Sequence, residues 1–349
     1  MVRCRISKMK HSVLACCVMC LLLISIHDFY ELNVRPVRYD DISSFPKYDY
    51  GFFFPLEIDI RKMVEEKIRN NTEPDFAPIN RHPFRYIHRP ASCSFNSTSH
   101  TRLKSEDSPN LLVLVKSAVK NDRLRMTIRM TWGKIKRPNV KVVFLLAHSA
   151  ASSQFISMES YTYRDIVQED FIDSYNNNTY KTIMGYNWAV KYCAEADFFL
   201  FVDDDHFVNI PKVLLYAKSI PVNERKMLLR GRKVISAKPS REDSKWVISK
   251  SDFPFHLFPP YPAGGAYLTS YNCALRFVHA FPYVEFFWID DVYLGIVAYK
   301  LNVTIHNVKQ FFTHEENPSL DEKGFFAHFN NHDVEDMVKA WQRAKVKYV

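Results

Sequence analysis

The stretch Phe198–Asp205, which reads FFLFVDDD, decides the fold class of this chain. Its apolar run, Phe198–Val202, has the length of a strand and is apolar on both faces. Such strands are typical of the interior of a parallel sheet that is covered by helices. Ligands bind these sheets beyond the carboxyl ends of the strands, and Asp203, Asp204 and Asp205 follow this strand with no spacer.

Strands and helices are expected to alternate on either side of this stretch. Apolar runs predict further buried strands at Leu111–Val115 and Val140–Ala147. Apolar spacing predicts helices at Asn121–Met130, Ser152–Tyr161, Tyr180–Ala194 and Ile210–Ser219, and a short one at Lys62–Asn70. This alternation predicts an α/β fold with right-handed crossovers.

The composition narrows the classes of protein. The chain has 349 residues, of which 47% are hydrophobic, so a sizeable core is expected. Its 8 glycines form neither G-x-G-x-x-G nor a Walker A loop, which excludes a glycine-rich phosphate-binding loop. The net charge is +9, but Lys and Arg are scattered among acidic residues, so no nucleic acid partner is expected.

The N-terminus carries a basic segment followed by an uncharged apolar run. Arg3, Arg5, Lys8 and Lys10 precede the run Ser12–Ile26. The run is compatible with a cleaved signal peptide or with an uncleaved signal-anchor whose N-terminus is cytoplasmic. We favour the anchor because no convincing small-x-small cleavage site follows the run. A buried soluble helix is a third alternative, against which its extreme N-terminal position argues.

The anchor sets the predicted organisation of the chain. Residues 1–11 are a cytoplasmic tail and residues 12–27 a transmembrane helix. Residues 28–108, rich in Pro, Tyr, Asn and charge, are a stem and lead-in, and residues 109–349 are a luminal folded domain.

Sequons and cysteines bear on the same organisation. Candidate N-glycosylation sites at Asn70, Asn96, Asn177 and Asn302 agree with a luminal domain. The cysteines beyond the anchor are Cys93, Cys193 and Cys273. At most one pair of them can form within the chain, and the sequence leaves the pairing open.

The adjacent carboxylates of Asp203, Asp204 and Asp205 predict a metal site. They repel one another at a buried strand end, and a divalent cation, Mn²⁺ or Mg²⁺, is the simplest compensation. Asp203 and Asp205 lie two residues apart, so they share a face of an extended backbone. The alternatives are an exposed acidic turn, a helix N-cap before Ile210, and a phosphatase-type nucleophilic aspartate, for which no downstream lysine and acidic pair is evident.

Several segments, in this order, resemble the β-1,3-galactosyltransferase family, glycosyltransferase family 31. They are Arg125–Gly133 (RMTIRMTWG), Tyr163–Tyr175 (YRDIVQEDFIDSY), Asn178–Thr182 (NTYKT), Val202–Asn209 (VDDDHFVN), Tyr261–Tyr267 (YPAGGAY) and Trp288–Gly295 (WIDDVYLG). The chain departs from the family pattern at Asp290, where the family usually has Glu, and in the glycine order at Gly264 and Gly265.

The resemblance implies a GT-A type fold, with a mixed, mainly parallel sheet flanked by helices. It implies that residues 109–349 transfer galactose or N-acetylglucosamine from a UDP-sugar to an oligosaccharide acceptor on glycoprotein or glycolipid, inverting to a β-1,3 linkage with the help of Mn²⁺ or Mg²⁺. It also implies a single-pass type II protein of the Golgi membrane. A non-catalytic glycan-binding or chaperone-like relative and a metal-dependent phosphohydrolase are the competing hypotheses.

The resemblance also suggests roles for individual residues. The catalytic base is expected to be Asp291, with Asp290 second, and the metal ligands Asp203 and Asp205. The expected donor-binding residues are Arg125, Arg129, Asp165, Lys181, Asp203 and Asp204, and the expected acceptor-binding residues Gly264, Gly265 and Tyr267.

Each role has a structural alternative. Arg129 and Trp132 are equally compatible with a structural stack, and Lys181 with an exposed helix lysine. Asp165 suits a turn or cap, and Asp291 suits the cap of a helix that begins near Val292. The aromatic segments Phe253–Phe258 and Phe281–Trp288 are expected in the core more than in a sugar-stacking wall.

Overall fold

The computed structural model describes residues 58–91, 93–95, 109–134, 137–242, 245–311, 326–328 and 334–346. The predicted tail, the predicted anchor and the sequon at Asn96 lie outside these residues. Within the described ranges, no helix is both long enough and apolar enough to cross a membrane. All described residues belong to one unit, Phe45–Val349.

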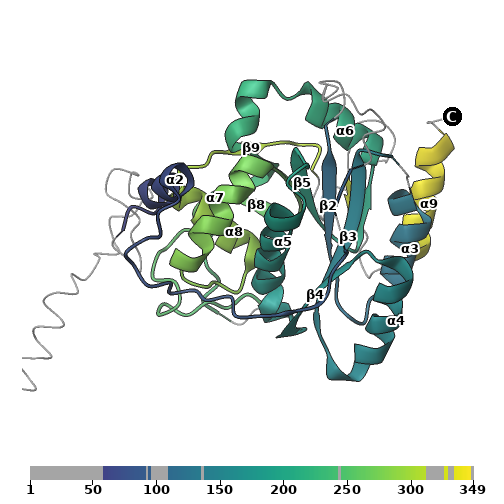
Figure 1. Cartoon of the computed structure of the whole chain (residues 1–349), viewed down its shortest axis with the longest axis horizontal. Coiled ribbons are helices and arrows are strands. Elements are labelled where there is room, and N and C mark those ends of the chain that lie inside the picture. The colour runs from purple at the N-terminus through teal and green to yellow at the C-terminus, as the bar shows by residue number, and fades with distance from the viewer. Residues whose placement is uncertain are drawn as a thin grey trace, which may run out of the picture. The chain divides into compact units, whose positions relative to one another are not determined.

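An eight-stranded mixed sheet forms the centre of this unit, in the order β1-β4-β3-β2-β5-β8-β7-β9 (Figure 1). Its parallel centre consists of β2 (Leu111–Lys116), β3 (Val140–His148), β4 (Ile166–Ile172) and β5 (Phe198–Asp203). The outer strands are β1 (Tyr86–His88), β7 (Leu229–Val234), β8 (Tyr261–Ser270) and β9 (Ile305–Asn307). β8 runs antiparallel to both β5 and β7.

Helices cover both faces of the sheet because each central strand is apolar on both sides. One face packs on α3 (Asp122–Met130), α4 (Ser153–Tyr163), α6 (Ile210–Ser219) and α9 (Val334–Val346). The other packs on α2 (Ile60–Asn70), α5 (Asn178–Tyr192), α7 (Tyr271–Ala280) and α8 (Asp290–Lys300). Figure 1 shows α3, α4 and α9 on one side of the sheet and α5, α7 and α8 on the other. Along β5, Phe199 and Phe201 face the second group of helices, and their neighbours face the first.

The predicted mixed, mainly parallel sheet flanked by helices is confirmed. The predicted strands are present, the predicted helix Ile210–Ser219 coincides with α6, and the other predicted helices differ from α2–α5 by one or two residues at one or both ends. The outer strands β7 and β8 are not among the predicted elements. β8 contains Pro262, Gly264 and Gly265, residue types that are depleted in strands, yet it pairs with strands on both sides.

The first described residues lie within the predicted stem and lead-in and pack against the sheet domain. On α2, Ile60 and Val64 are buried and Glu65 binds the guanidinium of Arg276 on α7, with Oε1 2.6 Å from Nε. Cys93 forms a disulfide with Cys193 at the end of α5, while Cys273 is buried and free. This part of the lead-in therefore belongs to the folded body.

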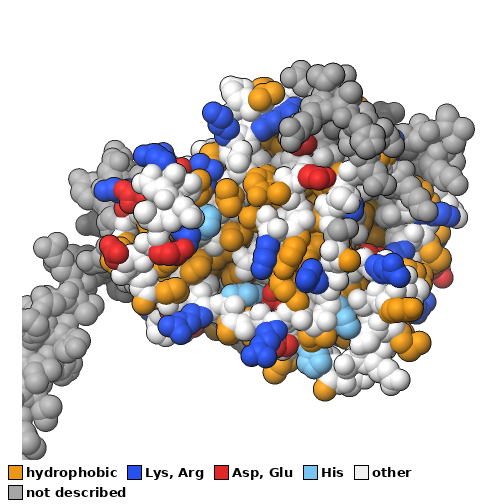
Figure 2. Space-filling model, in the orientation of Figure 1, with side chains coloured by type: hydrophobic (Ala, Val, Ile, Leu, Met, Phe, Trp, Pro, Cys, Tyr) orange, Lys and Arg blue, Asp and Glu red, His pale blue; other side chains and the backbone are white. Residues whose placement is uncertain are grey.

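Surface charge is dispersed on the face shown in Figure 2. Among the described residues drawn there, Lys and Arg side chains are spread between apolar and acidic ones rather than gathered in one patch. The sequon residues Asn70 and Asn302 are exposed and Asn177 is half-buried; their glycosylation stays a prediction.

The disulfide is expected to contribute to stability because it closes a loop across a sequence separation of 100 residues. Replacing Cys93 and Cys193 together by serine should lower the free energy of unfolding by about 2–5 kcal/mol. Urea denaturation checks this. Reductant should lower the stability of the natural protein to the level of the double variant and leave the variant unchanged. A natural protein insensitive to reductant would contradict the prediction.

Candidate active site

The site forms where the carboxyl ends of β2 and β5 lie side by side. Parallel pairing places Lys116, the last residue of β2, opposite Asp203, the last of β5. The Lys116 ammonium lies 3.0 Å from Asp203 Oδ1 and 2.7 Å from Asp290 Oδ2, and it donates to the carbonyl of Gly264 at 3.2 Å. This side chain is only 6% exposed. Lys116 is not among the site residues predicted from the sequence, although it follows the apolar run of β2 as Asp203 follows that of β5.

The protein itself supplies partners for its three adjacent aspartates. Asn121 Nδ2 donates to Asp204 Oδ2 at 3.0 Å, and His206 Nδ1 lies 2.6 Å from Asp205 Oδ1. The pKa of Asp203 is raised to about 6, because burial and the charge of Asp205 raise it by more than the Lys116 ammonium lowers it. Part of the compensation that the sequence attributes to a cation therefore comes from Lys116, Asn121 and His206.

A second acidic pair begins α8 beside this cluster. Asp290 Oδ2 accepts from Lys116 and from Thr182 Oγ1 at 3.0 Å. Burial alone would raise the pKa of Asp290, but the Lys116 charge and these hydrogen bonds outweigh it and hold the pKa below the usual value. Asp290 is therefore a fixed negative charge.

The pKa of Asp291 is shifted in the opposite direction to that of Asp290. Asp291 Oδ2 accepts from the Gly264 N–H at 3.1 Å and its Oδ1 from the Val292 N–H at 2.7 Å. Burial and the neighbouring charge of Asp290 raise the pKa of Asp291 to about 7. Adjacent carboxylates with pKa values driven apart are typical of acid–base sites, and here the free proton acceptor near neutral pH is Asp291.

The predicted acceptor-binding residues occupy two different environments. A Cβ on Gly264 would lie 3.3 Å from Asp291 Oδ2, and one on Gly265 would lie 2.7 Å from His206 Nε2. A Cβ on Gly265 would therefore overlap the His206 ring, and one on Gly264 would make a tight contact with the Asp291 carboxylate. Tyr267 is 1% exposed and its ring stacks on Phe201 with centroids 5.0 Å apart. The structure places Tyr267 in the core, out of reach of an acceptor.

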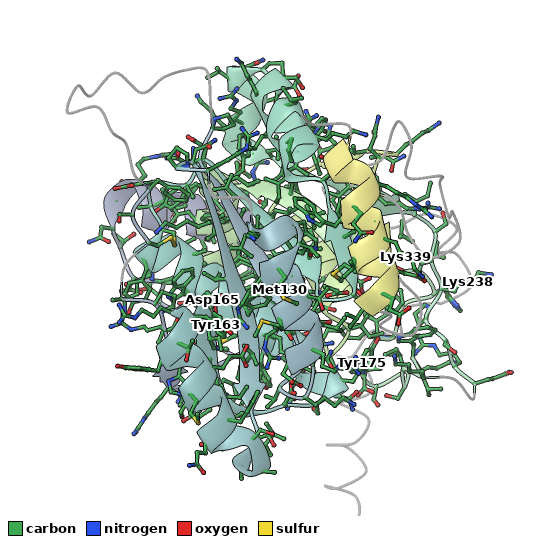
Figure 3. All side chains as sticks on the ribbon, turned by 90° about the vertical axis from the view of Figure 1, so that its right-hand side faces the viewer. Met130, Tyr163, Asp165, Tyr175, Lys238 and Lys339 are labelled. Carbon is green, nitrogen blue, oxygen red and sulfur yellow. A yellow bond between two sulfur atoms is a disulfide. The ribbon has the colours of Figure 1, made fainter. Side chains whose placement is uncertain are left out.

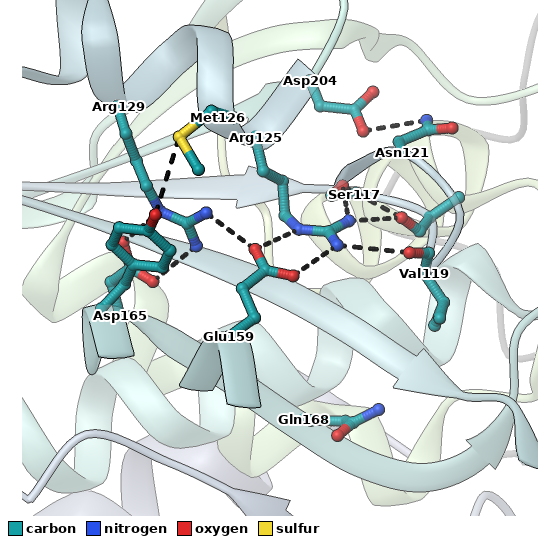
Figure 4. A network of polar contacts seen from close by, with 12 residues as sticks. Ser117, Val119, Asn121, Arg125, Met126, Arg129, Glu159, Asp165, Gln168 and Asp204 are labelled. Atoms are coloured by element: carbon teal, nitrogen blue, oxygen red, sulfur yellow. Dashed lines mark hydrogen bonds and ion pairs between the residues drawn. The ribbon is translucent and has the colours of Figure 1, made fainter. Parts of the chain in front are cut away.

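Arg125 is part of a buried network instead of an open binding surface (Figure 4). Its guanidinium is wholly buried and donates to both oxygens of Glu159 on α4, at 2.8 and 2.7 Å. It also donates to Ser117 Oγ and to the carbonyls of Ala118 and Val119. These contacts use all five guanidinium N–H groups, so none remains for a substrate.

Arg129 and Asp165 extend the same network. Arg129 donates to both carboxylate oxygens of Asp165 at 2.8 Å and to Glu159 at 2.7 Å. Its guanidinium lies over the rings of Phe144 and Tyr163, 4.6 and 4.1 Å from their centroids. The structural stack expected as the alternative is thus present, with Phe144 and Tyr163 in place of Trp132. In Figure 3, Tyr163 and Asp165 lie well apart from Tyr175, which borders the site.

Lys181 holds the loop that follows β2. Its ammonium is buried and donates to the carbonyl of Ser117 at 2.8 Å and to Asp173 Oδ1 at 3.2 Å, while Asp173 Oδ2 accepts from the Val119 N–H. Arg125 and Lys181 therefore both fix the loop 117–121, whose Asn121 reaches Asp204. Both residues therefore act on the site through this loop.

The residues present suit a cation held by few protein ligands. In the described part of the chain, no group of three or more His, Cys, Asp or Glu side chains has metal-binding geometry. Mg²⁺ and Mn²⁺ are commonly bound through one or two carboxylates together with substrate phosphates and water. Asp203, whose side chain is 36% exposed, and Asp205 fit that arrangement.

An aromatic rim, defined as Tyr175, Trp246 and Trp288, borders the acidic pair. Trp246 is 50% exposed and donates to the hydroxyl of Tyr175 at 2.9 Å. The ring of Tyr175, in the short helix η5 (Tyr175–Asn177), lies edge-on to Trp288, which precedes Asp290 by two residues. Burial raises the pKa of Tyr175, and the charges of Asp290, Asp291 and Asp203 raise it further, so its hydroxyl lies within their field. By contrast, Phe253, Phe258 and Phe287 pack together in the core, as expected.

The chain is similar to one family model and to several known proteins. The family model described as Galactosyltransferase matches residues 123–309. The chain is 34% identical to β-1,3-galactosyltransferase brn of Drosophila melanogaster over 247 residues, covering 68% of this chain and 76% of the relative. It is 34% identical to human β-1,3-galactosyltransferase 5 over 215 residues, covering 58% and 68%. The solved structure of the bifunctional glycosyltransferase WbbM aligns with 66% of this chain and 49% of its own, with a TM-score of 0.37 and 12% identity.

The network around Arg125 predicts that this residue contributes to stability rather than to substrate contact. Arg125→Lys keeps the charge but loses several of the hydrogen bonds to Glu159 and the loop, so the free energy of unfolding should fall by about 2–4 kcal/mol. Arg123→Lys, on the exposed side of the same helix, should change it by less than about 0.5 kcal/mol. Chemical denaturation measures both. Unchanged stability of Arg125→Lys with weakened nucleotide binding would contradict this assignment.

Proposed function

The chain belongs to the galactosyltransferase family, and from this premise we propose that it is an inverting β-1,3-glycosyltransferase that acts on a hydroxyl of a glycan acceptor. Membership of the family makes the protein a UDP-sugar glycosyltransferase. Galactose is the preferred donor sugar, since the relatives are named galactosyltransferases, and N-acetylglucosamine is the second candidate. The observation that carries the proposal is the divided acidic pair, in which Asp290 is held charged and Asp291 is left to accept a proton.

In the proposed reaction, Asp291 removes the proton of the acceptor hydroxyl as its oxygen attacks the anomeric carbon of the donor. The new carbon–oxygen bond forms on the face opposite the leaving UDP, so the bond to UDP breaks with inversion. A hydroxyl with its usual high pKa needs such a base at neutral pH. A divalent cation on Asp203 and Asp205 would offset the negative charge of the departing pyrophosphate.

The acceptor is proposed to lie against the aromatic rim. Aromatic rings bind the apolar face of a pyranose while its hydroxyls bond to polar groups nearby. Tyr175 and Trp246 are partly exposed, and the hydroxyl of Tyr175 lies within the field of Asp290 and Asp291. The N–H of Gly264 holds Asp291 in place there, which is a different role from direct acceptor contact.

The cellular setting is a further part of the proposal. The disulfide between Cys93 and Cys193 is typical of an oxidising compartment. Together with the sequons and the apolar N-terminal run, it supports a type II protein of the Golgi membrane with a luminal catalytic domain. A non-catalytic glycan-binding relative would have no need of the divided acidic pair.

Replacing the proposed base tests the mechanism. Asp291→Asn keeps the shape of the side chain but cannot accept the proton, so kcat should fall by about 10²–10⁴-fold. UDP binding, measured by calorimetry, should be retained. Asp252→Asn, an exposed aspartate away from the described contacts, is the matched control and should keep full turnover. Normal turnover in Asp291→Asn would reject this assignment.

Chelation tests the cation. Excess EDTA should abolish UDP-sugar transfer by the purified luminal domain, and added Mn²⁺ or Mg²⁺ should restore it, because the leaving pyrophosphate would otherwise depart uncompensated. Circular dichroism should show an unchanged fold in EDTA. Full activity in EDTA would mean that Lys116 and the other protein groups suffice.

The aromatic rim predicts an effect on the acceptor alone. Trp246→Ala should raise the KM for the acceptor by about two- to tenfold through loss of the stacked ring, with the KM for the UDP-sugar unchanged. Trp246→Phe keeps a ring and should stay close to the natural value. A rise in donor KM, or no change in acceptor KM, would place the acceptor elsewhere.

A further inference from the structure

We propose that Lys116 is a positioning residue that gives the two adjacent carboxylates of α8 separate roles: it binds Asp290 in place and leaves Asp291 to take the acceptor's proton. The inference rests on the proposed glycosyl transfer. All three N–H groups of the Lys116 ammonium have partners, which are Asp290, Asp203 and the carbonyl of Gly264. No donor remains for substrate, so Lys116 acts through these partners.

Lys116 first fixes the carboxylate of Asp290 through an ion pair. Asp290 and Asp291 are consecutive at the start of α8, and their contacts differ. Lys116 and Thr182 both donate to the same oxygen of Asp290, at 2.7 and 3.0 Å. The carboxylate is 16% exposed and charge-paired, so it is a poor proton acceptor.

The second step is the orientation of Asp291 through Gly264. Lys116 donates to the Gly264 carbonyl, and the N–H of the same residue donates to Asp291 Oδ2 at 3.1 Å. The residue that fixes Asp291 is thus itself fixed by Lys116. A Cβ at Gly264 would lie 3.3 Å from Asp291 Oδ2, so the backbone of Gly264 and this carboxylate are in close contact.

The third step is the rigidity of the support. Lys116 and Asp203 are register partners in the central parallel pair, β2 and β5, and both strands are buried along their apolar length. Groups mounted on such strands are held more accurately than groups on loops. Lys116 therefore connects the donor side at Asp203 with the base side at α8 through one ammonium.

The charges that face Asp291 define a readout. Asp290 raises its pKa and Lys116 lowers it, while the tyrosines that its charge affects, Tyr175, Tyr261 and Tyr267, are neutral at these pH values because their own pKa values are raised. Removing the ammonium should therefore move the acid limb of the pH profile upward. A residue that only fills space would lower kcat without moving this limb.

The test is a double-mutant cycle with Lys116→Met, which keeps length without charge, and Asp290→Asn. We expect Lys116→Met to lower kcat by on the order of tenfold or more, because it leaves a buried carboxylate unpaired. The acid limb of kcat/KM should rise by about 1 pH unit. Adding Asp290→Asn should return the limb toward its natural position, and the two substitutions should be coupled by about tenfold in kcat.

Two matched variants sharpen the cycle. Lys181→Met also removes a buried lysine near the loop 117–121 but makes no contact with Asp290 in the described structure, so it should combine additively with Asp290→Asn. Lys116→Arg keeps the charge, and its acid limb should stay near the natural pH even where kcat falls. If Lys116→Met does not fold, this variant decides: a limb displaced upward would overturn the proposal.

The outcomes separate this inference from the proposed function. No transfer by the natural protein with any UDP-sugar and glycan acceptor would reject the proposed function itself. Normal transfer by the natural protein, with Lys116→Met additive to Asp290→Asn and an unmoved acid limb, would reject only the role of Lys116.

Discussion

A single buried ammonium, that of Lys116, joins the parts of this protein on which its chemistry depends. It lies where β2 and β5 end in register and bridges Asp203, Asp290 and Gly264. Each of these groups comes from a different element, so the bridge forms only when the central pair, β8 and α8 are all in place. Buried ion pairs are weak sources of stability, because desolvation offsets their attraction. The consequence of this bridge is therefore geometric: it sets where each carboxylate lies and which of them carries a permanent charge.

The surrounding charges maintain that geometry. The loop 117–121 leaves β2 directly after Lys116 and is held by Arg125, Lys181 and Asp173, all through hydrogen bonds to its backbone or to Ser117. Glu159 in turn neutralises Arg125. The buried cations Arg125 and Lys181 are thus each paired with a carboxylate beside this loop, which is the condition under which their burial is tolerated.

The sequence predicts the central strands of the sheet better than the outer strands. Apolar runs such as Leu111–Val115 and Phe198–Val202 predict buried strands because both faces of a central strand are covered. β8 is not predicted in this way, because its Pro262, Gly264 and Gly265 have low strand propensity, and Gly264 and Gly265 pack closely against Asp291 and His206. The acidic residues of the site are predicted from their places after a strand and before a helix. The partners are not: nothing local to Arg125 or Lys181 distinguishes a substrate contact from a buried support, and Lys116 acquires its role only through strand register.

The central claim is that Asp291 is the catalytic base, with a pKa raised by burial and by the fixed charge of Asp290. The pH dependence of the natural protein tests this claim most directly. Burial and that neighbouring charge raise the pKa of Asp291 to about 7, so the basic form is present above that pH and is lost as the pH falls through it. At saturating cation and donor, kcat/KM for the acceptor should therefore fall with a single-proton acid limb near pH 7. A limb near pH 4, where an ordinary aspartate titrates, or a profile without an acid limb while the protein remains folded, would contradict the account.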